Sequence, residues 1–271
     1  AGHVKVVLSG EGADELFGGY NIYREPEALK KVAWIPFVLR RAVRKLAAKL
    51  PDVKGRDFLI RAGMKVEERF IGNAYIYCEK EKAQILKNKV TGPSTQEYLS
   101  QFYEELESEN RDSLQDMEKM QSVDLNYWLP GDILQKADKM SMAHSLEVRV
   151  PFLDKEVFNF AAKLPKEAKI AAGTTKYIFR KAVSEFLPQE TDERRKLGFP
   201  IPIRVWLRQN DWYQMVTDLF TSKAAEEFFR TEELLQLLKD HKDKKADNSR
   251  KIWTVLTFLI WYDRFFTTCS K

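Results

Sequence analysis

A helical spacing of apolar residues runs through most of the chain and predicts its secondary structure. Beyond residue 24, apolar positions recur every three or four residues and are separated by charged ones, which is typical of amphipathic helices. We expect Trp253, Leu256, Ile260 and Trp261, near the end of the chain, to lie in a core. The segments predicted as helices are 34–50, 56–70, 94–106, 113–128, 132–145, 155–164, 176–186, 211–220, 231–238 and 249–266.

Prolines and glycines divide this helical pattern. Pro130 and Gly131 predict a break between the two central helices, and Asp132 is placed to cap the second of them. The two prolines in residues 198–202 predict a stiff, extended loop, since proline cannot continue a helix. The body of the chain, residues 25–271, is therefore predicted to be a helical region.

The first 24 residues differ from this body. Residues 4–8 form a β-branched run that predicts a short, buried strand of the parallel type. The stretch that follows, Ser-Gly-Glu-Gly-Ala-Asp-Glu-Leu-Phe-Gly-Gly-Tyr over residues 9–20, is an acidic turn whose four glycines allow a ligand to approach the backbone closely. Because a lone strand needs neighbours to satisfy its backbone groups, we expect further strands upstream of it.

Three carboxylates in the turn suggest a metal. Glu11, Asp14 and Glu15 would repel one another and a bound phosphate unless a cation such as Mg²⁺ neutralised them. A magnesium-nucleotide site is one interpretation of the segment. Ordinary turn chemistry explains the same residues equally well on spacing alone, and neither a phosphate-binding Gly-Lys-Ser/Thr loop nor a dinucleotide fingerprint is present.

Length and composition narrow the class of protein. The 271 residues, 44% hydrophobic, are enough for one large domain or two small ones. The net charge of +5 is spread over helices with acidic residues between the basic ones, so we expect no nucleic-acid partner. The densest basic stretch, residues 40–49, is amphipathic, which favours a solvated face over a phosphate contact.

Cysteine, histidine and apolar runs exclude further classes. Cys78 and Cys269 lie far apart, and three isolated histidines do not complete a zinc site. No apolar run of 18 residues or leader pattern occurs, so we expect a cytoplasmic protein without a membrane partner.

A second polar cluster lies in residues 136–154. A helix through its first half places Lys136 and Asp138 on different sides. Glu147, Arg149 and Asp154 are interpreted first as ion-pair and capping groups that hold the turn at the following proline, with a ligand contact as the alternative.

A third candidate is Lys176, which follows Gly-Thr-Thr at the start of a predicted helix. A lysine is unfavourable at the positive end of a helix dipole, which suggests that it answers an anion. A solvated lysine is the simpler interpretation.

Together, residues 9–20, the 136–154 cluster, Lys176 and the Gly-Phe-Pro-Ile-Pro loop at 198–202 resemble the synthetase domain of glutamine-hydrolysing asparagine synthetases. The resemblance covers nearly the whole chain in the same order. It implies an α/β sheet of the ATP-pyrophosphatase (adenine nucleotide α-hydrolase-like) type, followed by a helical region. It also implies ATP and Mg²⁺ as cofactors, with aspartate activated as β-aspartyl-AMP before ammonia displaces AMP.

The resemblance also assigns residues. Glu11 matches the acid needed for the adenylate step, Asp14 a carboxylate that binds Mg²⁺-pyrophosphate, and Lys176 a catalytic lysine near the phosphates. The residues matched to ATP binding are Ser9, Gly10, Gly12 and Tyr20, and those held as further site candidates are Glu15, Lys136, Asp138, Glu147 and Arg149.

Two parts of that family are absent from these residues: the glutaminase domain with its leading cysteine, and the Ser-Gly-Gly-x-Asp-Ser pyrophosphate loop. We therefore expect a C-terminal part of a synthetase that receives ammonia from a glutaminase domain elsewhere and is inactive alone. A homodimer is compatible with the resemblance. Two alternatives stay open: an amidotransferase with another carboxylate acceptor, and a helical interaction domain without catalysis.

Overall fold

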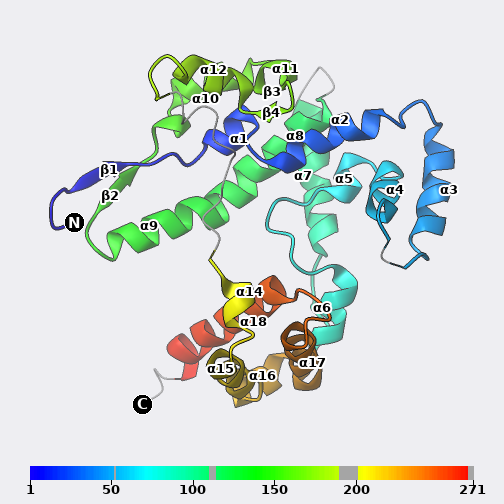
Figure 1. The fold of residues 1–271 in the computed structure, drawn as a ribbon, viewed down its shortest axis with the longest axis vertical. Helices are drawn as coiled ribbons and strands as arrows, with labels where there is room; N and C mark the ends of the chain where they lie inside the picture. The colour runs from blue at the N-terminus through cyan, green and yellow to red at the C-terminus, as the bar shows by residue number, and fades with distance from the viewer. Residues whose placement is uncertain (52, 110–113, 189–200, 268–271) are drawn as a thin grey trace. The chain divides into compact units, whose positions relative to one another are not determined.

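The computed structural model describes residues 1–51, 53–109, 114–188 and 201–267 (Figure 1). Contacts divide the chain into two compact units. Unit 1 comprises Ala1–Ala74 with Thr95–Arg195, and unit 2 comprises Tyr75–Ser94 with Lys196–Lys271. The sequence predicted a strand and an acidic turn in residues 1–24 and a helical region in residues 25–271. That division describes types of element along the chain, not compact units, and it stays a prediction.

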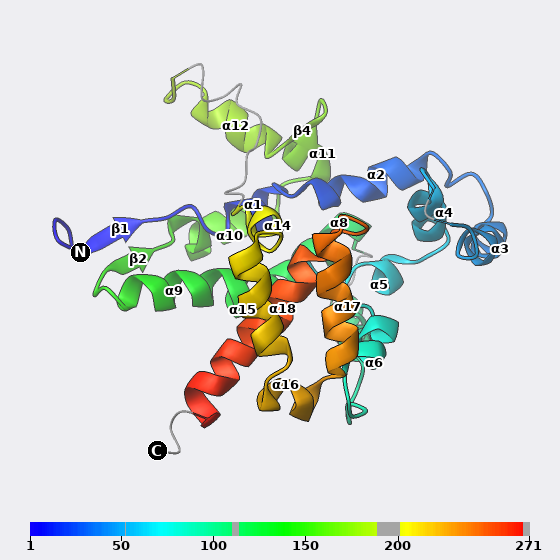
Figure 2. The same cartoon turned by 60° about the horizontal axis from the view of Figure 1, so that its bottom comes forward.

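Unit 1 is mainly helical, with a two-stranded parallel sheet and a two-residue antiparallel pair (Figure 2). Short elements pack against α7 and α8 at its centre. Its elements are β1 (Val6–Leu8), α1 (Ala13–Phe17), a 3₁₀ turn (Asn21–Arg24), α2 (Glu25–Lys30), α3 (Phe37–Ala47), α4 (Arg56–Ala62), α5 (Val66–Arg69), α7 (Thr95–Glu109), α8 (Asp116–Val123), a π-helix (Asp124–Leu134), α9 (Gln135–Met142), β2 (Glu147–Arg149), a 3₁₀ turn (Pro151–Leu153), α10 (Lys155–Ala162), α11 (Lys166–Lys169), β3 (Ile170–Ala171), β4 (Thr174–Thr175) and α12 (Tyr177–Val183).

The predicted first strand exists, but it begins two residues later than predicted and is not buried. β1 pairs in parallel with β2, and both views show the two strands side by side next to α9. Val4, Val6 and Leu8 are 51%, 42% and 73% exposed. The prediction of a buried strand is therefore wrong for the described residues, because the two-stranded sheet is covered only in part and leaves the face that carries Val6 and Leu8 exposed.

The central helices are continuous. α8, the π-helix and α9 follow one another without a gap, so the predicted break at Pro130 and Gly131 is wrong. Asp132 lies inside the π-helix and does not cap a second helix. Proline lacks an N–H and its ring needs room against the preceding turn, and the wider i→i+5 turn of a π-helix accommodates both requirements.

Two predicted helices are shorter than the apolar pattern suggested. Residues 34–50 give α3, which starts only after Pro36. Residues 56–70 give two helices, α4 and α5, separated at Gly63. A Cβ at Gly63 would lie 2.5 Å from the carbonyl oxygen of Arg40, so glycine is what lets α4 approach α3.

The core of unit 1 has two parts. The larger joins the 3₁₀ turn after α1 to α5, α7 and α8 through Tyr23, Val66, Phe70, Leu99, Tyr103, Met117, Met120 and Val123. The smaller holds α1 against α10 through Leu16, Phe17 and Ala161. α1, which follows the glycine-rich turn, is thereby fixed on its apolar side.

Unit 2 encloses one apolar cluster. Its elements are α6 (Glu79–Ile85), α14 (Ile203–Trp206), α15 (Asn210–Phe220), α16 (Lys223–Phe228), α17 (Thr231–Lys242), α18 (Ser249–Tyr262) and a terminal π-helix (Asp263–Thr267). Its buried residues are Ile85, Leu207, Val216, Phe220, Ala225, Phe229, Leu234, Leu238, Ile252, Val255, Leu256 and Leu259.

One face of α18 enters this cluster. Leu256 is buried as predicted, whereas Trp253, Ile260 and Trp261 are 37%, 49% and 47% exposed. The core prediction was wrong for these three residues because the face that packs inward carries positions 252, 255, 256 and 259.

Several expectations concern what the chain lacks. Within the described ranges, no helix combines the length and apolar character needed to cross a membrane. Cys78 is a free thiol, and Cys269 lies outside the described residues, as do positions 198–200 of the proline-rich loop.

Candidate functional site

The glycine-rich turn joins the end of β1 to α1. Gly12 caps α1 with a φ of +89°, and a Cβ there would lie 2.3 Å from Cδ2 of Leu153. Both constraints favour glycine, since other residues avoid positive φ. The Ser9 amide donates to the carbonyl of Arg149 at 2.8 Å, and the Ser9 hydroxyl donates to the Glu11 carboxylate. The turn is therefore tied to β2 on one side and to α1 on the other.

Asp14 and Lys176, predicted separately, lie together. Nζ of Lys176 is 3.0 Å from Oδ1 of Asp14, and both side chains are partly exposed. Lys176 caps α12 in the left-handed region, with a φ of +54°. A Cβ on Gly19 would lie 1.8 Å from Asp14 Oδ1 and 2.5 Å from Lys176 Cε. The absence of a side chain at Gly19 is what leaves room for this ion pair.

Glu15 and Tyr20 support the turn from inside. Glu15 is 1% exposed and accepts a hydrogen bond from the Tyr20 hydroxyl at 2.6 Å. Nε1 of Trp128 donates to the same hydroxyl at 3.3 Å. Burial and the neighbouring Glu15 carboxylate raise the pKa of Tyr20, so the phenol stays protonated. Of the turn's three carboxylates, Glu15 is the one buried as a structural acceptor.

Two residues beneath α1 were not predicted from the sequence. Nε2 of Gln121 donates to the carbonyl of Leu16 at 3.2 Å and also to that of Glu15. Nζ of Lys169 donates to Oε1 of Gln121 at 3.2 Å, and burial lowers the pKa of this lysine. A glutamine and a lysine inside helical patterns give no sequence signal, because such residues are normally solvated.

A second buried network also escaped prediction. Asp124, fully buried at the start of the π-helix, accepts from the Tyr23 hydroxyl at 2.6 Å. It also accepts from the backbone N–H of Asn73 at 3.1 Å and from Nδ2 of Asn73 at 2.7 Å. Burial raises the pKa of Asp124 to about 6. This carboxylate fixes the chain just after the glycine-rich turn against the central helix.

The residues of the 136–154 cluster have separate positions. Lys136 and Asp138 are exposed on α9, and within the described ranges no ion pair involves either. Arg149 Nε lies 2.8 Å from Glu147 Oε1 on the exposed surface of β2. Asp154 caps α10 by accepting from the amide of Glu156 at 2.8 Å. This geometry agrees with the ion-pair and capping interpretation.

The donor set at the turn fits a nucleotide-bound metal better than an all-protein one. In the part of the chain that the structure describes, no three His, Cys, Asp or Glu side chains gather as a metal site. Mg²⁺ commonly takes one or two carboxylates and completes its shell with phosphate oxygens and water. Asp14, partly exposed beside a lysine, is suited to that arrangement.

Comparisons with known proteins agree with the resemblance seen in the sequence. Residues 1–263 match the family described as Asparagine synthase. Over 96% of its length the chain is 48% identical to asparagine synthetase [glutamine-hydrolyzing] 1 of Bacillus subtilis, and it spans 40% of that protein. It is 42% identical, over 97% of its length, to a putative asparagine synthetase [glutamine-hydrolyzing] of Mycobacterium bovis, and again spans 40% of it.

A shorter stretch, 36% of the chain, is 38% identical to the asparagine synthetase [glutamine-hydrolyzing] of Gallus gallus and spans 19% of it. No solved structure gives a significant match. The family match extends over nearly all of the chain and includes the turn, the central helix and Lys176. The chain therefore belongs to the asparagine synthase family.

Proposed function

We propose that the protein carrying these residues amidates aspartate to asparagine at the expense of ATP. In this reaction an oxygen of the aspartate side-chain carboxylate attacks the α-phosphorus, and pyrophosphate leaves with its bonding electrons. Ammonia then attacks the acyl carbon of β-aspartyl-AMP, AMP leaves, and the nitrogen loses a proton to solvent or a base. Membership in the family and the names of the relatives support this assignment.

The observation that carries the proposal is the Asp14–Lys176 pair above Gly19. The first step needs the growing negative charge on pyrophosphate to be balanced, and positioned electrostatic groups achieve this. We assign Lys176 to the leaving pyrophosphate and Asp14 to the Mg²⁺ that accompanies it. Bound Mg²⁺ supplies charge neutralisation across the phosphates.

The remaining turn residues take the supporting roles that the resemblance implies. Ser9, Gly10 and Gly12 supply backbone and hydroxyl groups to ATP, and Glu11 is the acid of the adenylate step. Tyr20 is assigned to ATP binding with less support, because its hydroxyl is engaged by Glu15 and Trp128.

Further properties belong to the same proposal. They are an ATP-pyrophosphatase-type sheet that includes β1, ammonia supplied by a glutaminase domain, a cytoplasmic location and a homodimer. Another carboxylate acceptor would use the same phosphate-facing residues, so an assay must offer more than aspartate.

The test measures AMP release by the complete encoded protein with ATP, Mg²⁺, ammonia and aspartate. We expect Lys176→Met to lower the rate at least a hundredfold, and the matched control Lys181→Met, on the exposed side of α12, to leave it unchanged. The 271-residue chain alone is expected to release little or no AMP.

Two results would contradict the proposal. One is a Lys176→Met protein with full activity, and the other is AMP release that requires neither ammonia nor a carboxylate. Release with a carboxylate other than aspartate would retain the chemistry and replace the acceptor.

A further inference from the structure

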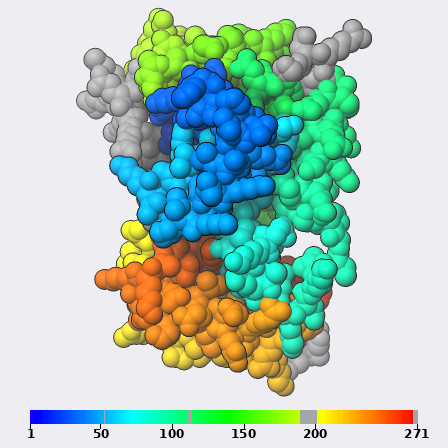
Figure 3. Space-filling view, turned by 90° about the vertical axis from the view of Figure 1, so that its right-hand side faces the viewer, coloured from blue at the N-terminus to red at the C-terminus, as the bar shows by residue number. Residues whose placement is uncertain are grey.

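The helix α3 turns its apolar side toward solvent. Val38, Leu39 and Leu46 are 78%, 56% and 67% exposed, and Trp34 just before the helix is 80% exposed. Figure 3 looks onto this side of unit 1, where residues of α2 and α3 form the blue surface. A contiguous apolar stripe of this kind is uncommon on a soluble surface and marks a contact site.

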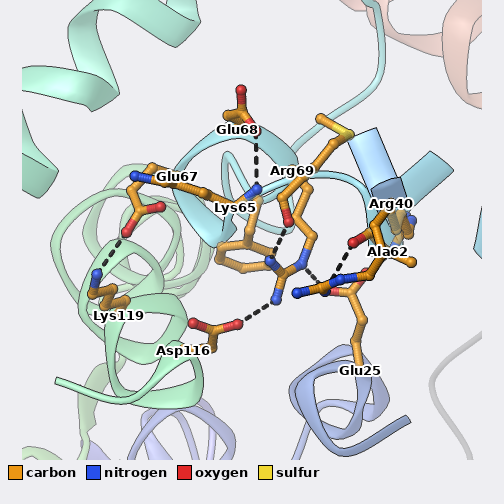
Figure 4. Close-up of polar contacts among 12 residues, drawn as sticks. Glu25, Arg40, Ala62, Lys65, Glu67, Glu68, Arg69, Asp116 and Lys119 are labelled. Carbon is orange, nitrogen blue, oxygen red and sulfur yellow. Dashed lines mark hydrogen bonds and ion pairs between the residues drawn. The ribbon is translucent and has the colours of Figure 1, made fainter. Parts of the chain in front are cut away.

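The opposite, basic side of α3 packs against the protein. Arg40 donates to the carbonyls of Ile35 and Ala62, each at 3.0 Å, and Figure 4 shows its side chain reaching Ala62 on α4. Arg41 and Arg44 point to Glu68 of α5, at 3.3 and 3.9 Å. Because these arginines hold one side of α3 against the protein, the apolar side of the helix faces solvent.

Ion pairs anchor α4 and α5, on which α3 packs, to the rest of unit 1. Arg69, which is almost fully buried, lies 2.9 Å from Glu25 on α2 and 2.6 Å from Asp116 on α8 (Figure 4). Arg61 of α4 reaches the same Glu25 at 2.6 Å. Since both α4 and α5 are tied to α2, the apolar stripe of α3 is held outward.

Exposed lysines accompany the stripe. Of the nine lysines and arginines in residues 28–56, Lys30, Arg41, Arg44 and Arg56 are paired with carboxylates. Lys45, Lys49 and Lys54 are exposed beside the stripe. An amphipathic helix with apolar side chains, flanking lysines and a tryptophan at one end is typical of an interfacial membrane helix.

We propose that residues 34–50 dock on an anionic phospholipid surface, with α3 lying in the plane of the headgroups. Apolar side chains enter the acyl boundary, and the lysines pair with acidic headgroups. A second copy of the chain is a poorer occupant, because a symmetric contact would bring two sets of exposed lysines together. The inference differs from the expectation of no membrane partner, which rested on the lack of a spanning segment.

The test is sedimentation of the complete encoded protein with sucrose-loaded vesicles of phosphatidylcholine alone or with one quarter phosphatidylglycerol. We expect binding to the anionic vesicles at least tenfold stronger than to the neutral ones, and weaker binding at 500 mM than at 100 mM NaCl. Val38→Glu combined with Leu46→Glu should lower binding at least tenfold. Val90→Glu, at a valine that is 65% exposed in unit 2, is the matched control and should change nothing.

A second pair of variants keeps the test valid if the glutamates disturb folding. Lys45→Gln with Lys49→Gln leaves the apolar stripe intact, and each lost charge should weaken anionic binding about fivefold. Equal binding to both vesicle types, or no effect of either double variant, would overturn the proposal. Light scattering without lipid adds one more decisive outcome: a dimer that Val38→Glu dissociates would mean that a second copy occupies the stripe.

Discussion

Unit 2 gathers its buried apolar residues in one cluster among its own helices and exposes others on α18, whereas unit 1 exposes apolar side chains more fully on β1 and α3. In unit 2, Leu234, Leu238 and Val216 are completely buried. In unit 1, Leu8 and Val38 are more than two-thirds exposed, and the paired charges of the candidate site lie near the end of β1. Within the described residues, the most exposed large apolar side chains and the Asp14–Lys176 pair lie in unit 1, so we expect changes in unit 1 to affect activity and binding more than changes in unit 2.

The largest expected effect is a loss of AMP release when the glycine-rich turn of unit 1 is changed. In Gly19→Ala, the added Cβ would overlap the Asp14 carboxylate and the Lys176 side chain, so we expect AMP release by the complete protein to fall at least a hundredfold. Gly131→Ala, where the added Cβ meets no atom within 4 Å, is the control and should retain activity. A fully active Gly19→Ala protein would show that the ion pair is not needed.

The second prediction compares how much stability is lost when a leucine is shortened in each unit. Leu256→Ala should lower the free energy of unfolding of unit 2 by roughly 2–5 kcal/mol, because it opens a cavity in a closed core. Leu46→Ala, at a leucine that is 67% exposed on α3, should cost less than about 0.5 kcal/mol. Urea denaturation of both variants measures the difference. Equal losses would mean that the α3 stripe is covered in solution.

The smallest predicted effect concerns pH and Asp124. Its pKa of about 6 in the folded protein lies above the ordinary 3.8, so the folded state binds this proton more tightly than the unfolded state. The group therefore lowers stability as the pH rises from about 4 to about 6. Asp124→Asn stays neutral. The stability of wild type relative to the variant should fall by up to about 3 kcal/mol across that window.

Urea titrations of both proteins at pH 4, 5, 6 and 7 check this prediction. Taking the difference removes the contributions of carboxylates that the two proteins share. Parallel curves would show that Asp124 is solvated, and that unit 1 is more open around the central helix than the structure indicates.

Local patterns predicted the elements of the fold better than their ends or their packing. Helical periodicity found the central helices because it reports local amphipathicity, but it did not locate the π-helix that carries Pro130. It also placed Trp253 and Trp261 in the core, since composition does not say which side of α18 has a neighbour.

The residues of the candidate site could be singled out where they are unusual in sequence and not where they are ordinary. The glycine and acidic residues of the turn, with Lys176, stand out by type and spacing, and the structure brings Asp14 and Lys176 together. Gln121, Lys169 and Asp124 make their buried hydrogen bonds only because folding removes these side chains from water. Burial of that kind depends on contacts between distant segments, which no local pattern encodes.

The uninterrupted central helix has a mechanical consequence for the turn. Its 27 residues, 116–142, span about 40 Å, hold α1 through Gln121 near one end, and lead at the other into β2. β2 pairs with β1, and β1 leads back to the turn at Ser9. The central helix, β2, β1 and the turn are therefore connected in a closed circuit. A strand added along the outer edge of β1 would therefore set the position of Glu11 without touching it.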